Sequence, residues 1–138
     1  MHERAGSKNV LHLHGELLKV RSTKNPRLVY NWTKDVLLGD FCEENSQLRP
    51  HIVWFGEEVP MLEKAIEITA KADILLIIGT SMQVYPAANL INFVAPKIPI
   101  YFIDPRPTIQ KNYFPNLTVI AEKASIGVVK VVTELIDL

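Results

Sequence analysis

The stretch Asp73-Ile-Leu-Leu-Ile-Ile-Gly79 decides the fold, because every residue between its two ends is apolar. A half-exposed strand alternates apolar and polar residues, whereas a parallel strand covered by helices on both faces is apolar throughout. We therefore expect residues 74–78 to form a buried parallel strand at the centre of the fold. Such a strand requires helices before and after it in the chain.

Helical patterns flank this strand on both sides. Between Pro60 and Ala72, apolar residues recur at helical spacing and charged residues occupy the opposite face. The apolar face consists of Leu62, Ala65, Ile66 and Thr69. Pro86 can open the next helix and Pro96 can close it. The face of this second helix consists of Ala87, Leu90, Ile91 and Val94.

Two further strands and a last helix complete the C-terminal half. Residues 98–104 (IPIYFID) and 117–121 (LTVIA) are strand-like, and Ser125 is expected to cap the final helix. The residues expected to pack that helix are Val128, Val129, Val132, Leu135 and Ile136. The alternation predicts an α/β fold, a partial Rossmann-like doubly wound parallel sheet, whose ligands bind at the carboxyl ends of its strands.

The N-terminal part has a different pattern. Residues 9–13 (NVLHL) suggest a short strand ended by His14-Gly15, and residues 28–32 (LVYNW) suggest a second. After the Arg49-Pro50 break, residues 51–57 (HIVWFGE) are strand-like up to the glycine.

We divide the chain accordingly. Residues 1–18 and 51–138 are assigned to the Rossmann-like domain, and residues 19–50 to a small inserted module. Its expected apolar residues are Leu28, Val29, Tyr30, Trp32, Val36, Leu37 and Phe41.

Composition excludes several classes of function. The chain has 138 residues, with 15 Lys plus Arg and 15 Asp plus Glu, so no global field attracts nucleic acid or an anionic membrane. No signal stretch opens the sequence and no apolar run could span a bilayer, so we expect a soluble, cytoplasmic protein. Cys42, the single cysteine, permits neither an intrachain disulfide nor a multi-cysteine zinc site, and we expect it to be a packing residue.

Polar residues follow two of the predicted strands. Gly79-Thr80-Ser81 combines a glycine, which lets a ligand approach the backbone, with two hydroxyl groups. Asp104 ends the next strand, where a carboxylate can accept hydrogen bonds from the hydroxyls of an adenosine ribose. Taken singly, the first segment also fits an ordinary turn, and the second fits a solvent-facing acid before a proline.

Two histidines stand two residues apart near the N-terminus. His12 and His14 would project from the same face of a strand, which makes a metal site conceivable, but no recognised ligand spacing joins them to other residues. We therefore predict no metal site. His14, at a strand end before a glycine, suits a general base instead.

Three segments resemble successive signature segments of the sirtuin family of NAD-dependent protein lysine deacylases. They are residues 2–20 (HERAGSKNVLHLHGELLKV), 48–60 (LRPHIVWFGEEVP) and 72–91 (ADILLIIGTSMQVYPAANLI), in the family's order. The similarity becomes thin from about Thr108 onward.

The resemblance implies a site and its chemistry. By motif match, His14 is the base that deprotonates a ribose hydroxyl of NAD after nicotinamide departs, so that the acyl group ends on ADP-ribose. NAD contacts would come from Gly79, Thr80, Ser81, Asp104, Pro105, Arg106 and Ala124. An acyl-lysine peptide would pair as an added strand, with substrate contacts from Val53, Phe55, Gly56, Glu57 and Val84.

The chain also departs from the family pattern. Many sirtuins hold the inserted module with four zinc-binding cysteines, and only Cys42 is present, so zinc is not expected. Asp104 stands where the family more often has Asn. The family's glycine-rich segment and its Gln-Asn-Ile-Asp-like segment both precede the HERAGS motif, so we expect this chain by itself to be impaired in NAD binding and cleavage. Association with an N-terminal fragment, or with further copies of the chain, is expected to cover exposed apolar surface.

Two alternatives to the deacylase remain open at this point. A non-catalytic module that binds NAD or ADP-ribose would be consistent with a sequence that does not contain the glycine-rich and Gln-Asn-Ile-Asp-like segments. An interaction remnant would keep only peptide binding. Release of nicotinamide in the presence of an acetyl-lysine peptide distinguishes the enzyme from both.

Overall fold

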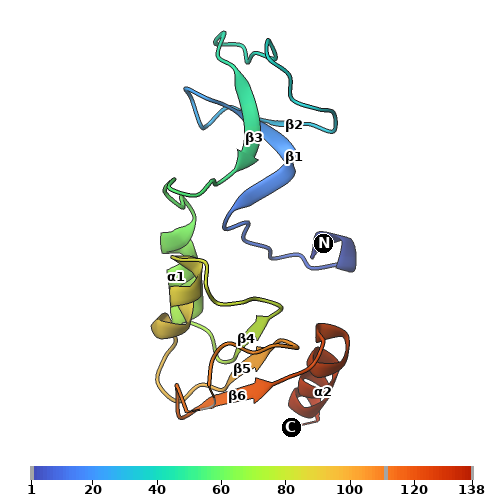
Figure 1. Cartoon of the computed structure of the whole chain (residues 1–138), viewed down its shortest axis with the longest axis vertical. Helices are drawn as coiled ribbons and strands as arrows, with labels where there is room; N and C mark the ends of the chain where they lie inside the picture. Colours follow the sequence, from blue (N-terminus) through green and yellow to red (C-terminus); the bar gives the residue numbers. More distant parts are fainter. Residues whose placement is uncertain (1, 111, 138) are drawn as a thin grey trace. The chain divides into compact units, whose positions relative to one another are not determined.

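A computed structural model describes residues 2–110 and 112–137. The chain divides after Met61 into two compact units (Figure 1). The first contains an antiparallel sheet and the second a parallel sheet with helices. The division into residues 1–18 with 51–138, and 19–50, stays a prediction.

The first unit is built on three strands. Its elements are η1 (Glu3–Ala5), β1 (Gly15–Ser22), β2 (Val29–Asn31) and β3 (Leu48–Ile52). The sheet has the order β2-β1-β3, and β1 pairs antiparallel with both neighbours. Its core joins the buried Val20, Cys42 and Leu48 to the partly buried Leu28, Tyr30, Trp32 and Val36.

Three expectations for this unit are wrong. Residues 9–12 lie outside any strand, and Gly15 of the His-Gly pair begins β1 instead of following the end of a strand. The strand expected at 51–57 starts before Pro50 and stops at Ile52, because β3 is an edge strand, where the missing N–H of a proline is tolerated. Some of the apolar residues assigned to the module core are exposed, namely Val29, Leu37 and Phe41.

The second unit is an α/β layer structure, as predicted. Its elements are α1 (Leu62–Ala70), β4 (Leu75–Ile78), η2 (Ala87–Phe93), β5 (Ile100–Ile103), β6 (Leu117–Ile120) and α2 (Ala124–Ile136). The three strands are parallel in the order β4-β5-β6, and α2 lies alongside them in Figure 1. Within the described sheet the central strand is therefore β5, whereas we expected the segment at 74–78 to be central and buried. Because β4 is an edge strand of this sheet, Ile74 and Ile78 are exposed.

Helical elements cover both faces of this sheet. Phe102 is fully buried in a cluster with Ile91 of η2. The next residue, Ile103, faces α2 at Gly127, where an added Cβ would lie 2.6 Å from the Cγ2 of Ile103. Because successive residues of a strand point to opposite faces, the two contacts belong to opposite layers.

The final helix packs differently from the expectation. Lys123, not Ser125, occupies the N-cap position, and its side chain makes no capping hydrogen bond. The buried residues of α2 are Gly127 and Val131, whereas Val129, Val132 and Ile136 are exposed. The glycine lets the helix approach the sheet closely, and part of the apolar stripe faces solvent.

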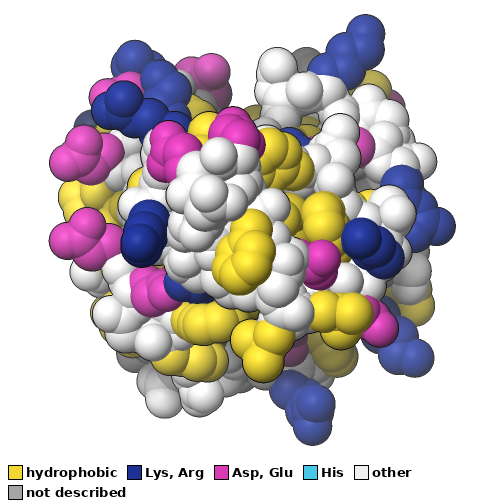
Figure 2. Space-filling model, turned by 90° about the horizontal axis from the view of Figure 1, so that it is seen from above, with side chains coloured by type: hydrophobic (Ala, Val, Ile, Leu, Met, Phe, Trp, Pro, Cys, Tyr) yellow, Lys and Arg dark blue, Asp and Glu magenta, His cyan; other side chains and the backbone are white. Residues whose placement is uncertain are grey.

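Large apolar side chains also lie open on the surface of the first unit, among them Leu17, Leu18 and Leu38. The face in Figure 2 shows hydrophobic groups between charged ones of both signs. No helix within residues 2–110 and 112–137 is long and apolar enough to cross a membrane.

Candidate functional site

In the second unit, each strand of the parallel sheet is followed by one of the predicted ligand segments. Gly79 follows β4, Asp104 follows β5, and Ala124 begins α2 shortly after β6. Because parallel strands end at the same edge of a sheet, the fold brings the three segments to one edge. This agrees with the place at which doubly wound sheets bind ligands.

The turn at 79–81 is open above its backbone. Gly79 has a φ of 61°, and a Cβ added there would meet nothing within 4 Å. Its N–H donates to the carbonyl oxygen of Ile103 at 2.9 Å, which ties the turn to β5. The hydroxyl of Thr80 accepts from the N–H of Met82 at 3.2 Å and keeps its own proton to donate. This backbone can therefore approach a ligand, as the sequence predicts.

The turn after β5 is held by its own aspartate. The Oδ1 of Asp104 accepts from the backbone N–H of Arg106 at 2.7 Å. No described residue donates a hydrogen bond to its Oδ2, which leaves an acceptor for a ligand hydroxyl. Pro105 and Arg106 are exposed.

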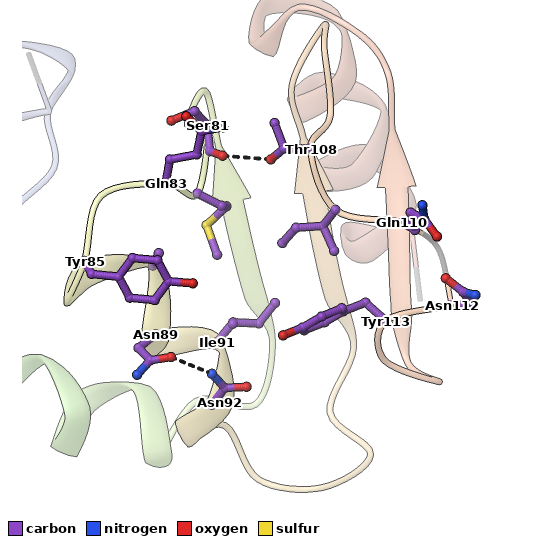
Figure 3. A pocket seen from close by; sticks show the side chains of 13 residues that line it. Ser81, Gln83, Tyr85, Asn89, Ile91, Asn92, Thr108, Gln110, Asn112 and Tyr113 are labelled. Atoms are coloured by element: carbon purple, nitrogen blue, oxygen red, sulfur yellow. Dashed lines mark hydrogen bonds between the residues drawn. The ribbon is translucent and has the colours of Figure 1, made fainter.

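A hollow of about 440 Å³ lies beside the 79–81 turn (Figure 3). Ser81 is the one predicted contact in its lining, and its carbonyl oxygen accepts from the hydroxyl of Thr108 at 2.7 Å. Amide and hydroxyl groups surround the hollow, from Gln83, Tyr85, Asn89, Asn92 and Gln110 among others. No motif singled out Thr108, because the family resemblance becomes thin there.

In the first unit, His14 stands immediately before β1 and its side chain is exposed. The carbonyl oxygen of His14 accepts from the N–H of Val53 at 3.0 Å. Gly15 has a φ of 90°, and a Cβ added there would lie 2.1 Å from the carbonyl oxygen of His51. Only glycine allows this approach of β1 to β3, so the glycine of the His-Gly pair has a steric reason.

His12 lies in a different environment. Its Nε2 is 2.6 Å from the Oε1 of Glu3 and 3.7 Å from the Oε1 of Glu16. Among the described residues, this trio brings its ligand atoms within 4.8 Å of one another, as a metal site requires. The other carboxylate oxygen of Glu16, however, accepts from Lys19 at 2.9 Å, so the trio is equally an ion-pair cluster.

The loop of residues 53–57, called here the 53–57 loop, carries four of the predicted substrate contacts. Val53 is half-buried, whereas Phe55 and Gly56 are exposed. The carboxylate of Glu57 contacts Arg49 and Arg21, at 2.5 and 3.3 Å respectively.

Hydrogen bonds from Arg49, followed by one from the N–H of Trp54, lower the pKa of Glu57 from 4.5 to about 2. The fifth predicted substrate contact, Val84, belongs to the second unit and is exposed.

Comparison with known proteins gives a consistent result. Residues 1–86 match the Sir2 family. A protein of Helicobacter pylori named NAD-dependent protein deacylase is 59% identical over 106 residues, which cover 77% of this chain and 46% of that protein. A protein of the same name from Bacteroides thetaiotaomicron is 45% identical over 137 residues, covering 93% of this chain and 57% of its own length.

The fold agrees with that of a solved relative. The crystal structure of a Sir2 homolog–NAD complex has a TM-score of 0.83 at 33% identity, covering 99% of this chain and 54% of the other. The chain thus spans about half the length of the curated relatives it matches.

Proposed function

Because the chain belongs to the Sir2 family, we propose that it takes part in the NAD-dependent removal of acyl groups from protein lysines. The observation that carries the proposal is the exposed imidazole of His14, whose backbone just before β1 is held by a hydrogen bond from the N–H of Val53 and by the close approach of Gly15 to β3. Similarity to two proteins named NAD-dependent protein deacylase supports the reaction class.

NAD fits the described residues of the second unit. The open space above Gly79, the hydroxyl groups of Thr80 and Ser81, and the second carboxylate oxygen of Asp104 suit a ribose and a phosphate, and Ala124 would lie against the adenine. Bound NAD would supply an electrophilic ribose carbon once nicotinamide leaves. The likeness to a Sir2 homolog–NAD complex supports this choice of cofactor.

His14 has the chemistry of the base. A neutral imidazole can accept a proton from a ribose hydroxyl and return it at neutral pH. The 53–57 loop would pair with an extended acyl-lysine segment through its main chain, with Val53 and Phe55 beside the acyl-lysine side chain. The acyl group is transferred to ADP-ribose and the lysine is released.

We keep two finer predictions. The cytoplasm stays the predicted compartment. Association with a further polypeptide also stays a prediction, and the exposed leucines of the first unit support it.

The test is to incubate the chain with NAD and an acetyl-lysine peptide and to measure nicotinamide and deacylated peptide together. His14→Ala should lower the yield of deacylated peptide by about 10²–10⁴-fold, because it removes the base that acts after nicotinamide has left. It should leave the circular dichroism spectrum unchanged, because the side chain is exposed. Lys24→Ala, an exposed substitution in the same unit, is the control and should retain full activity.

Two results would count against the proposal. Equal and measurable activity of His14→Ala and the unmodified chain would remove His14 from the mechanism. Binding of NAD without release of nicotinamide, at any peptide concentration, would support a nucleotide-binding module in place of an enzyme.

A further inference from the structure

The 53–57 loop is tied to the antiparallel sheet at both ends. At its start, the N–H of Val53 donates to the carbonyl oxygen of His14 at 3.0 Å. At its end, the carboxylate of Glu57 is held by donors from two strands and from the loop itself. Between these ties, Phe55 is almost fully exposed, at 96%. The exposed middle of the loop is therefore held by its two ends.

Arg49 of β3 makes most of the contacts at the second tie. Its Nη1 lies 2.5 Å from the Oε1 of Glu57, and its Nη2 lies 3.1 Å from the Oε2, which is a bidentate ion pair. Its Nη2 also donates to the carbonyl oxygen of Ile52 at 3.3 Å. The guanidinium carbon lies 3.8 Å from the centre of the Trp54 ring. The Arg49 side chain therefore contacts Ile52 at the end of β3, the ring of Trp54 and the carboxylate of Glu57.

Glu57 has further partners. Arg21 of β1 donates to its Oε2 at 3.3 Å, and the N–H of Trp54 donates to the same oxygen at 3.0 Å. The side chains of Arg21 and Arg49 are 15% and 16% exposed, so water screens these ion pairs less than it screens pairs on an open surface. The low pKa of Glu57 fits a carboxylate surrounded by these donors.

These contacts change the role assigned to Glu57. A carboxylate whose two oxygens already accept from two guanidinium groups and one amide is poorly placed to bind a substrate as well. Its contribution is to fix the backbone of the loop. The N–H groups of Val53, Trp54 and Glu57 are already engaged, which leaves those of Phe55 and Gly56 to pair with an added strand.

We propose that Arg49, supported by Arg21, is a positioning residue that holds the 53–57 loop, through Glu57 and Trp54, in the shape that receives an extended acyl-lysine segment. This inference rests on the proposed function. A loop that is already ordered loses less conformational entropy when a peptide binds, so the clamp raises affinity for the peptide without touching it. Arginine is required, because lysine offers neither the bidentate fork nor the planar face that stacks on indole.

The chain offers a matched control for the stacking contact. Lys34 lies 4.5 Å from the centre of the Trp32 ring in the same unit but outside the 53–57 loop. Lys34→Ala therefore removes a cation from an indole face without changing the loop. A comparison of Arg49→Ala with Lys34→Ala isolates the effect of the clamp.

The experiment measures the Kd of an acetyl-lysine peptide and, separately, the Kd of NAD, for the unmodified chain and for each variant. Arg49→Ala should weaken peptide binding by at least about tenfold, because the loop loses its fixed shape. Arg49→Lys should recover only part of this loss. NAD binding should stay unchanged, because its predicted contacts lie in the second unit, and Lys34→Ala should change neither constant.

Nuclear magnetic resonance of the backbone amides provides an assay without ligand. In Arg49→Ala the amide signals of Trp54 and Glu57 should shift and broaden, whereas those of β2 should not. Glu57→Gln, which keeps the shape of the side chain but removes its charge, tests the same clamp from the other side. It should weaken peptide binding in the same direction, even if Arg49→Ala proves too unstable to study.

The outcomes distinguish failure of the proposed function from failure of the positioning role of Arg49. If the unmodified chain binds no acetyl-lysine peptide, the proposed function fails, and the amide signals still show whether the arginine orders the loop. If the chain binds the peptide and Arg49→Ala binds it equally well, the positioning role is refuted. Parallel loss of peptide and NAD binding would also refute it, since that pattern indicates a general loss of structure.

Discussion

Replacing Gly15 by alanine should strongly destabilise the first unit. The backbone at this position has a φ of 90°, and the new methyl group would lie 2.1 Å from the carbonyl oxygen of His51. It would also lie 2.9 Å from the Cα of Ile52, the residue that pairs with Gly15 across the two strands. All the nearest atoms belong to the backbone of β3, so no side chain can rotate away to make room.

The size of the effect follows from two separate costs. A non-glycine residue in left-handed backbone conformation lowers the free energy of unfolding by about 1–2 kcal/mol. Overpacking against atoms that cannot move adds about 1–3 kcal/mol. The sum is a large part of the ~5–15 kcal/mol that stabilises an ordinary domain.

Gly39 provides the control for the first cost alone. It lies in the same unit with a φ of 98°, and a Cβ added there would meet nothing within 4 Å. Gly39→Ala should therefore lower the free energy of unfolding only by the cost of the left-handed backbone conformation. The free energies of unfolding of the two variants should differ by about 1–3 kcal/mol. Urea unfolding followed by circular dichroism measures both. Equal losses for the two variants would show that β1 and β3 do not approach as closely at Gly15 as the structure has it.

Two further predictions concern the core and the pH dependence. Phe102→Ala should lower the free energy of unfolding by about 3–5 kcal/mol, because the ring is fully buried, whereas the exposed Phe55→Ala should change it by less than about 0.5 kcal/mol. Urea titrations decide this, and similar losses would contradict the burial. Because the pKa of Glu57 is lowered from 4.5 to about 2, its stabilising contribution is present above pH 4.5 and is lost as the pH falls toward 2. The melting temperature of Glu57→Gln should therefore lie below that of the unmodified chain at pH 7 and converge with it at low pH; a constant gap would be inconsistent with the ion pairs.

The second unit could be predicted well because its pattern is simple. A run of consecutive apolar residues is typical of a parallel strand, so β4 and β5 stand out in the sequence, although only β5 is largely buried. The order of the strands could not be obtained in this way, because an apolar run does not reveal its neighbours. The packing of α2 was also missed. Its contact with the sheet is made at Gly127, and a glycine adds nothing to an apolar stripe.

The first unit was harder to predict, because a glycine or a proline in the sequence does not show by itself where a strand begins or ends. A glycine can end a strand or, with a positive φ, begin one, and Gly15 begins β1. Pro50 suggested a break, but it is tolerated on the edge strand β3. The motif match identified Glu57 as part of the substrate segment. It gave no indication of Arg49, whose role depends on contacts that only the folded loop creates.

In both units the predicted site residues are held mainly by backbone. The carbonyl oxygen of His14 accepts from Val53, the N–H of Gly79 donates to Ile103, and Asp104 accepts from a main-chain N–H. Main-chain bonds depend little on the identity of the side chains that flank them, whereas a glycine with positive φ cannot be replaced without strain. Short motifs with fixed glycines can therefore indicate a candidate site in the sequence. Its positioning residues, which act through side chains such as Arg49, have to be found in the structure.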